Sequence, residues 1–275
     1  MKMNEQIIKY LDVFEKQYDE SNLEKFSFHD SADHLIRFLR DRRLRIAVDH
    51  YLKVSQVSPA DNNVLVVCSG VGGEGTFLAN VGFRSVTVSD FSESALKICE
   101  KRDQRLATMV LDAENLELPD QSYDLVLVQD GLHHLQRPVC GFTEMLRVAR
   151  KGVIIIEPHL GLVATVLGTV WEEHDGIVNY VFRWNRHMFE EISYSFFLRR
   201  PLYLKHIRLW DHNVVMGKLG RLFGGGKMSL FFVHFSYWIL DIFLGWLGNM
   251  FIGIIVKDPP PRYASTKNAS PTPRT

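Results

Sequence analysis

The stretch that decides the fold is residues 63–83, NVLVVCSGVGGEGTFLANVGF. Residues 64–68 form a short apolar run that ends in a polar turn, which predicts a buried strand. A glycine-rich turn follows at residues 69–75, and apolar residues at helical spacing then predict a helix near 75–82. The segment is therefore expected to open a β-α-β unit.

A second predicted strand at residues 85–89 ends at Asp90, which places an acidic side chain at the tip of that strand. This arrangement is typical of units that bind the adenosine half of a cofactor. The glycines let the backbone approach the ligand, and the acid accepts hydrogen bonds from the ribose hydroxyls.

The bulk composition suits a globular protein of one large α/β domain with additions. The chain has 275 residues, of which 46% are hydrophobic and 12% aromatic. Its 32 basic and 32 acidic residues cancel, which argues against nucleic acid as a partner, because phosphate binding needs a basic field. The three cysteines form no CxxC pair, and no long apolar run opens the chain. We therefore expect a cytoplasmic protein without a secretory signal.

Strands and helices alternate from residue 63 to residue 157. The expected strands are 64–68, 85–89, 107–111, 124–129 and 153–157, and the expected helices are 75–82, 92–103 and 138–149. This alternation predicts a doubly wound parallel sheet, whose ligand lies at the carboxyl ends of the strands.

The flanking segments divide the chain further. We expect a helical N-terminal cap over 1–58, the main domain over 59–258 and a disordered tail over 259–275. The basic run at residues 40–45 has two interpretations, a solvated helix face or a contact to a cofactor carboxylate or anionic substrate. Further on, a capped helix is expected from Asn185, a strand at 202–209 and a flexible connection at 217–227.

Residues 228–256 are strongly apolar, and Asp241 is the one formal charge among them. An acid at the centre of a membrane-spanning helix costs about 2.5–3.5 kcal/mol, and Gly248 with Asn249 is typical of a turn. We therefore expect a helix at 229–247 and a strand at 250–256. The helix has three interpretations: a buried or lid helix, a peripheral membrane surface, and a true span.

The glycine turn at residues 70–75 matches the pattern GxGxxG. Alone, this pattern is a weak signal. With Asp90 it fits a nicotinamide dinucleotide site, another nucleoside site, or a tight turn that binds nothing.

Three later segments separate these interpretations: LDAENLELPDQSYDLV at 111–126, QDGLHHL at 129–135, and MLRVARKG followed by VIIIEP at 145–158. In this order they resemble the class I S-adenosylmethionine-dependent methyltransferases, most closely the small-molecule type 11 group. The resemblance covers about residues 60–160. It implies a Rossmann-like, seven-stranded doubly wound α/β sheet that ends in an antiparallel hairpin of strands 202–209 and 250–256. The inserts at 160–200 and 212–248, the second of them hydrophobic and helical, would then cover the acceptor.

The resemblance also assigns roles to single residues. The glycine loop would hold the methionine portion, Asp90 the ribose and Asp112 the adenine amino group. The cofactor-binding residues carried over in this way are Ser69, Gly70, Gly72, Asp90, Phe91, Asp112, Ala113 and Gln129. Two residues depart from the family pattern. Val66 stands where the family usually has an acid, and Cys68 where it usually has glycine.

Methyl transfer from a sulfonium is an in-line displacement, so alignment carries most of the rate. A hydroxyl acceptor can need a general base. The tentative candidates are His133, His134, His159 and Glu157; the alternatives are a structural motif for the histidine pair and a solvent-facing position for His159. The acidic stretch before His174 matches no firm metal-ligand spacing, and we expect a charged loop and no metal.

The resulting hypothesis is a methyltransferase that uses S-adenosyl-L-methionine to modify oxygen or nitrogen on a small, hydrophobic or lipid-linked acceptor. Peripheral membrane contact through 228–248 is part of this expectation. One alternative is an NAD(P)-dependent oxidoreductase, which leaves the Asp112 segment unexplained. The other is a non-catalytic copy that serves as a scaffold, which Val66 and Cys68 favour.

Overall fold

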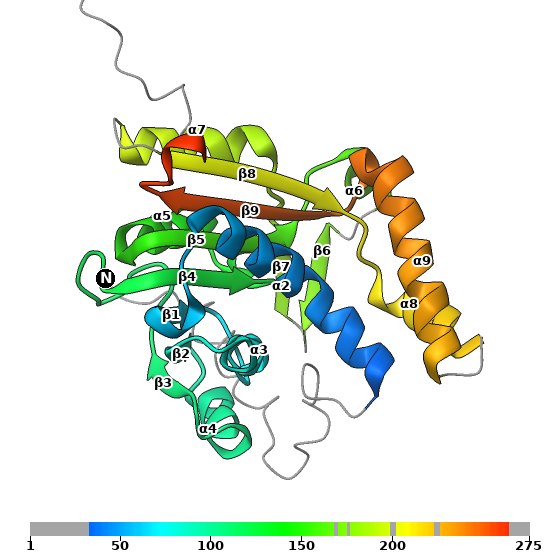
Figure 1. Cartoon of the computed structure of the whole chain (residues 1–275), viewed down its shortest axis with the longest axis horizontal. Coiled ribbons are helices and arrows are strands. Elements are labelled where there is room, and N and C mark those ends of the chain that lie inside the picture. The colour runs from blue at the N-terminus through cyan, green and yellow to red at the C-terminus, as the bar shows by residue number, and fades with distance from the viewer. Residues whose placement is uncertain (1–32, 168–169, 175–176, 199–201, 223–225, 264–275) are drawn as a thin grey trace, which may run out of the picture.

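The computed structural model describes residues 33–167, 170–174, 177–198, 202–222 and 226–263, and a seven-stranded sheet runs through its centre (Figure 1). In spatial order the strands are β3 (Ala107–Val110), β2 (Ser85–Asp90), β1 (Asn63–Val66), β4 (Tyr123–Gln129), β5 (Ala149–Pro158), β9 (Met250–Lys257) and β8 (Leu202–Leu209). The first five are parallel, and β9 enters antiparallel between β5 and β8. This order confirms the predicted doubly wound sheet with a terminal antiparallel hairpin.

Helices cover both faces of the sheet. They are α2 (His34–Ser55), α3 (Gly73–Val81), α4 (Glu93–Arg102), α5 (Pro138–Val148), α6 (Leu162–Leu167), α7 (Arg186–Phe197), α8 (Asn213–Leu222) and α9 (Gly226–Leu244). Single 3₁₀ turns are η2 (Pro59–Asp61), η3 (Leu132–His134), η4 (Gly245–Leu247) and η5 (Pro261–Tyr263). The Asp33 side chain caps α2 by accepting from the Leu35 amide. The expected cap of α7 is in place, because the Asn185 side chain accepts from the Met188 amide.

Alternate residues of each central strand enter two separate cores, because successive side chains of a strand point to opposite faces. Val64 and Val66 of β1 pack with Leu44, Val48 and Tyr51 of α2 and with α3. Leu65 and Val67 pack on the other side with α5 and α7. Both faces of the central strands are therefore buried, which explains the unbroken apolar runs of β1, β4 and β5.

The strand β9 is buried along its whole length. Its Gly253 lies under the Phe189 ring, so a Cβ there would come 2.6 Å from a ring carbon. On the other face of the sheet, Gly152 of the neighbouring strand β5 likewise leaves room for a ring, because a Cβ there would lie 2.3 Å from the Tyr51 ring. These glycines let α7 and α2 sit close to the sheet.

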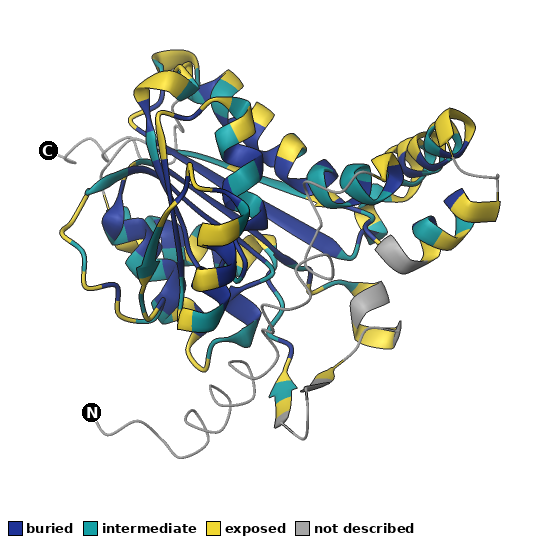
Figure 2. Ribbon diagram, turned by 90° about the horizontal axis from the view of Figure 1, so that it is seen from below, coloured by how far each residue is buried: buried dark blue, intermediate teal, exposed yellow. Residues whose placement is uncertain are grey.

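Helices α8 and α9 extend away from the sheet as an arm (Figure 2). A small third core, formed by Leu35 and Leu39 of α2, Met216 of α8, and Val233 and Tyr237 of α9, attaches the arm to the first half of α2. The arm corresponds to the hydrophobic insert expected before the last strand.

The sequence predictions fail at three places. The flexible connection expected at 217–227 is wrong for residues 217–222, which complete α8. The charged loop expected around His174 is wrong for 171–174, because they form strand β6 (Trp171–His174), paired with β7 (Ile177–Tyr180). The disordered tail is wrong for residues 261–263, where Tyr263 packs at 5.8 Å on Tyr203. Residues 1–32 and 264–275 of the expected cap and tail lie outside the described residues.

Candidate cofactor site at the strand ends

The glycine turn after β1 is built from left-handed residues, with φ of 53° at Cys68, 51° at Gly70 and 80° at Gly72. Gly72 is the N-cap of α3. A Cβ at Gly72 would lie 2.3 Å from Cys99 Sγ, and one at Gly75 would lie 2.4 Å from Val88. Gly72 thus serves the turn, and Gly75 the close packing of α3 on β2.

The Cys68 position shows how this chain tolerates its departure from the family pattern. Its left-handed backbone is strained for a side chain. The side chain packs against Gly131 in the loop after β4, where a Cβ would lie 2.4 Å from that of Cys68. The side chain at position 68 thus has room because the facing residue, Gly131, has no side chain. Burial raises the pKa of the Cys68 thiol well above its ordinary value, which makes it an unreactive packing group.

Asp90 lies at the tip of β2, as expected, directly beside the glycine turn. Its carboxylate accepts from the Gly70 amide at 2.7 Å and from the Ser92 amide at 3.0 Å. Phe91 follows and is 38% exposed. The Leu111 amide donates to the Asp90 carbonyl at 3.1 Å, which brings the exit of β3 to the same edge.

Asp112, the second expected acid, is exposed at that edge. It organises a tight turn, in which its Oδ1 accepts from the Glu114 amide at 2.8 Å. Ala113 points into the second core and anchors the turn. The structure therefore brings Asp90, Phe91 and Asp112 together around the carboxyl ends of β2 and β3.

Glu74, in the first turn of α3, is the site residue that sequence reasoning missed. Its carboxylate accepts from Ser69 Oγ at 3.3 Å and from Gln129 Nε2 at 3.4 Å, across the ends of β1 and β4. Gln129 is buried, and its Oε1 has no hydrogen-bond partner among the described residues. The available signal was an acid inside the glycine turn itself, four residues after the position of Gly70.

The tentative catalytic residues lie after β4 and at the end of β5. Glu157 is fully buried and accepts from the backbone amides of Gly131, Leu132 and His133 at 2.8–3.3 Å. It also pairs with His133 Nδ1 at 2.7 Å. Glu157 thus holds the turn η3 in place and orients His133. Its role as a base stays a prediction.

The two other candidate histidines differ in access. The His134 ring lies 4.1 Å from that of His133, and its side chain is half-buried. His159 is buried against Phe251, and burial lowers its pKa to about 4, so its ring is neutral at physiological pH. His134 is therefore the more accessible of the two to an acceptor.

Two arginines of the basic run make buried ion pairs with residues far away in the sequence. Arg43 bonds both carboxylate oxygens of Asp130, at 2.8 and 2.5 Å, and lies 2.7 Å from Asp211. Arg42 pairs with Asp241 of α9. The interpretation of a solvated face is thus wrong for these two residues, which are 4% and 8% exposed. Burial raises the pKa of Asp211, while Arg43 holds that of Asp130 low despite the desolvation of that carboxyl.

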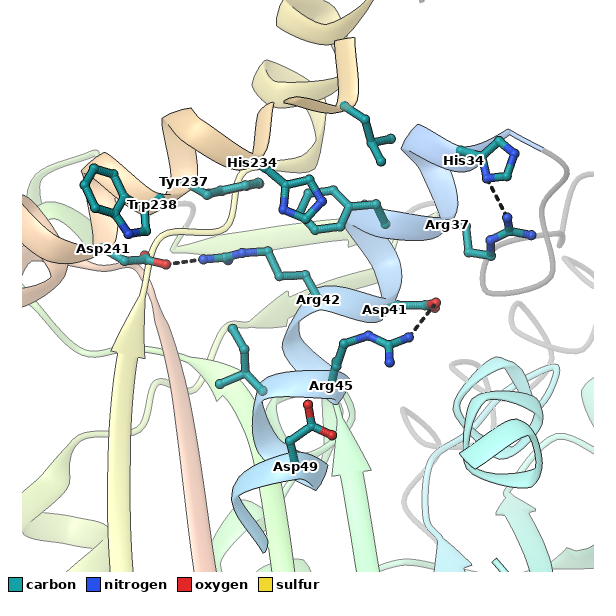
Figure 3. A pocket seen from close by; sticks show the side chains of 13 residues that line it. His34, Arg37, Asp41, Arg42, Arg45, Asp49, His234, Tyr237, Trp238 and Asp241 are labelled. Atoms are coloured by element: carbon teal, nitrogen blue, oxygen red, sulfur yellow. Dashed lines mark hydrogen bonds and ion pairs between the residues drawn. The ribbon is translucent and has the colours of Figure 1, made fainter. Parts of the chain in front are cut away.

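A separate cavity of about 580 Å³ lies between α2 and α9 (Figure 3). Arg37, Arg42 and Arg45 of α2 line one side, and His234 and Trp238 of α9 line the other. The glycine turn does not contribute to it. The cavity is mixed in polarity and belongs to the base of the α8–α9 arm.

Comparison with known proteins agrees with this geometry. The family model described as "Methyltransferase domain" matches residues 65–156, the segment that contains the glycine turn, Asp90, Asp112 and Gln129. Residues 65–156 therefore belong to a methyltransferase domain, which confirms the resemblance inferred from the sequence.

Curated relatives match the central part of this chain. Over 134 residues it is 31% identical to "Demethylmenaquinone methyltransferase" of Clavibacter sepedonicus, covering 47% of this chain and 52% of that one. Over 110 residues it is 33% identical to "Phthiotriol/phenolphthiotriol dimycocerosates methyltransferase" of Mycobacterium tuberculosis, covering 38% and 39%. The matches span about half or less of the relatives' own length.

Solved structures share the fold of this chain at low sequence identity. Phosphoethanolamine N-methyltransferase 2 of Haemonchus contortus aligns with a TM-score of 0.56 and 15% identity, covering 90% of this chain and 60% of that one. The cyclase SpnF aligns with a TM-score of 0.52 and 13% identity, covering 78% and 80%. Because a cyclase shares the architecture, these likenesses establish the fold and leave the reaction to the site.

Proposed function

We propose that this methyltransferase binds S-adenosylmethionine at the carboxyl ends of β1, β2 and β4 and transfers its methyl group to a small apolar or lipid-linked acceptor. The observation that carries the proposal is the gathering of the glycine turn, Asp90 and Asp112 at one sheet edge. A structure of the Haemonchus contortus relative contains S-adenosylmethionine, which supports the same donor here.

The residues at this edge fit the parts of the cofactor. In this proposal Asp90 accepts from the ribose hydroxyls and Phe91 packs against the adenine ring. Asp112 and the Ala113 amide then bind the adenine edge. Asp90 already accepts from Gly70, so it also fixes the turn that the cofactor would contact.

Glu74 supplies the acid that the family pattern places at Val66. In this proposal its carboxylate and the unpartnered Gln129 Oε1 accept from the methionine ammonium. The Ser69 hydroxyl and the Gln129 amide hold Glu74 in position. A buried acceptor without a partner is costly, and a ligand ammonium would satisfy it. The missing acid at Val66 therefore gives no support to a degenerate site.

The sulfonium donor brings an already activated methyl group, so the protein has mainly to align and desolvate the reactants. Such alignment can supply about 7–11 kcal/mol of the barrier. His134, near the end of β4, is the accessible group for removing a proton from an oxygen or nitrogen acceptor. His133 and Glu157 would act by positioning the loop that carries it.

The acceptor class is inferred from the apolar arm and from the relatives. Two of the relatives are named as methyltransferases of demethylmenaquinone and of phthiotriol/phenolphthiotriol dimycocerosates. Both are compatible with an apolar acceptor in this chain.

Calorimetric titration with S-adenosylmethionine, S-adenosylhomocysteine and NADH tests the donor. We expect micromolar binding of the first two only. Asp112→Ala should weaken it by about 10-fold, through loss of a hydrogen bond to a charged group. Asp90→Asn should weaken this binding at least as much. Glu117→Ala, which removes an exposed acid from the same loop, is the matched control and should leave binding unchanged.

Transfer of labelled methyl groups from S-adenosylmethionine into the organic phase of a lipid extract tests the acceptor. Label in that phase, reduced with the Asp112→Ala variant when the donor is below saturation, supports an apolar acceptor. Label only in the aqueous phase would overturn that part of the proposal. Donor binding without any transfer would favour the scaffold alternative.

A further inference from the structure

Helix α9 carries a second apolar face that nothing covers among the described residues. We call it the outer face of α9, and it consists of Met228, Phe231, Phe235, Trp238 and Ile242. These residues are spaced three or four apart and therefore form one stripe. They are 47–61% exposed, although all are large and apolar. Phe235 stacks on both Phe231 and Trp238, with ring centroids 6.2 and 5.9 Å apart.

The opposite side of α9 is already used for folding. Ser229 Oγ donates to the Gly220 carbonyl at 2.5 Å, and Val233 and Tyr237 are buried in the third core. Asp241 pairs with Arg42 and accepts from the Trp210 amide. The outer face thus takes no part in the packing of α9 on the described residues. An exposed apolar stripe of this kind marks an interaction surface.

The charges of the arm indicate what the surface meets. Between residues 213 and 247 the formal charges are Lys218, Arg221, Lys227 and Asp241. The three cations are exposed, whereas the acid is paired with Arg42. The arm therefore carries exposed cations as well as exposed aromatic rings, a combination typical of helices that lie in the headgroup region of an anionic bilayer.

We propose that the α8–α9 arm docks on the surface of an anionic membrane, with α9 parallel to the bilayer plane and its outer face in the headgroup layer. Trp246, in the turn η4 that directly follows α9, is also 63% exposed. Tryptophan is favoured at this depth, because its ring is apolar and its N–H stays hydrated.

The contacts of α9 favour this orientation over a transmembrane span. By length and composition α9 with η4 is the one described helix that could cross a membrane. A span would pull Asp241 away from Arg42 and Tyr237 away from Asp211, to which its hydroxyl donates at 3.2 Å. It would also place Asp241 near the centre of the bilayer, where an acid is costly. Docking in the plane keeps all of these bonds.

The test is co-sedimentation of the full chain with vesicles of phosphatidylcholine alone and of phosphatidylcholine with phosphatidylglycerol. We expect binding to the mixed vesicles to be at least about 10-fold stronger, because the arm carries three exposed cations. Phe231→Ser/Phe235→Ser should weaken binding at least about 10-fold, through loss of two inserted rings. Lys218→Glu/Arg221→Glu should remove the preference for the anionic lipid.

The matched control is Phe196→Ser/Leu198→Ser, which removes two exposed apolar side chains from the end of α7 and should leave binding unchanged. Circular dichroism and thermal unfolding establish that each variant is folded. Donor binding by the variants should be unaffected, so that failure of this proposal is distinguishable from failure of the proposed enzyme activity.

Three results would overturn the proposal. The first is no co-sedimentation of the wild-type chain, or equal loss in the α7 control. The second is resistance of the bound protein to alkaline carbonate extraction, which would indicate a span. The third is a dimer in light scattering that Phe231→Ser/Phe235→Ser converts to a monomer, with no vesicle binding by either; a second copy would then cover the outer face.

Discussion

Replacing Arg43 by Met should destabilise the protein strongly and in a pH-dependent way. Arg43 is the shared cation between Asp130 and Asp211. Methionine keeps most of the volume and removes the charge. The two carboxylates then respond differently. Asp130 is 37% exposed and can be hydrated, whereas Asp211 is 5% exposed and cannot.

The magnitude follows from the two ways in which Asp211 can respond. Leaving it ionised and unpaired should cost about 3–5 kcal/mol. Protonating it instead, at pH 7 and from its ordinary pKa of 3.8, costs about 4.4 kcal/mol, which sets a ceiling on the loss. If Asp211 takes up a proton in the folded variant, its pKa is raised above the unfolded value. The variant then loses stability as pH rises, by about 1.4 kcal/mol per pH unit.

Urea unfolding of wild type and variant at about pH 5, 6 and 7 measures this directly. We expect the gap in unfolding free energy to be about 3–4.4 kcal/mol at pH 7 and to shrink as the pH falls toward 5. The control is Arg45→Met on the same helix. Arg45 is 60% exposed and 3.8 Å from Asp41, so its loss should cost at most about 1 kcal/mol. A gap below about 1 kcal/mol for Arg43→Met, or one that does not change with pH, would refute the reasoning.

Three further predictions concern the site and its surroundings. Glu74→Gln should weaken S-adenosylhomocysteine binding about 10–100-fold in calorimetry, since it removes the charge that accepts the ammonium, yet spare methylthioadenosine, which has no amino-acid portion; equal loss for both ligands would contradict this role. Because the buried His159 ring has a pKa of about 4 in the folded protein, the fold loses stability as the pH falls from 6.5 toward about 4. His159→Leu should therefore flatten the pH dependence of thermal unfolding across that window. His187→Ala, which removes an exposed ring, should leave that dependence unchanged. Gly131→Ala should cost about 1–3 kcal/mol through its clash with Cys68, and Cys68→Gly should recover part of that loss; additive effects in the double-mutant cycle would disprove the contact.

Local patterns were sufficient to predict the sheet and one edge of the site. The apolar runs of β1, β2 and β4 are short and bounded by turn residues, so periodicity located them to within a few residues. Asp90 was singled out because it ends a predicted strand, and Asp112 because of the family resemblance. The two lie near each other because all parallel strands end at the same edge.

The features that failed depend on contacts between distant residues. Arg43 pairs with Asp130 and Asp211, which are far away in the sequence, and helical periodicity carries no information on such contacts. The basic run was therefore interpreted as a solvated helix face. Glu74 is held at the site by a hydrogen bond from Gln129, which lies 55 residues away in the sequence. The glycines at 224–226 suggested a flexible connection over 217–227, but residues 217–222 belong to α8, which packs on α2 through Gly220, where a Cβ would lie 2.4 Å from Leu35. In each case tertiary packing overrode the local signal.

The position of β9 sets the order in which this chain can complete itself during synthesis. The edge strand β8 pairs with β9 along its whole length, and in the described sheet it has no other neighbour. It can therefore complete its hydrogen bonds only once residue 257 has left the ribosome. By that point the newly made α8–α9 arm is already outside, with its aromatic stripe exposed. A pause in translation just before β9 would lengthen a stage in which this stripe and an unpaired strand are exposed together, which favours aggregation.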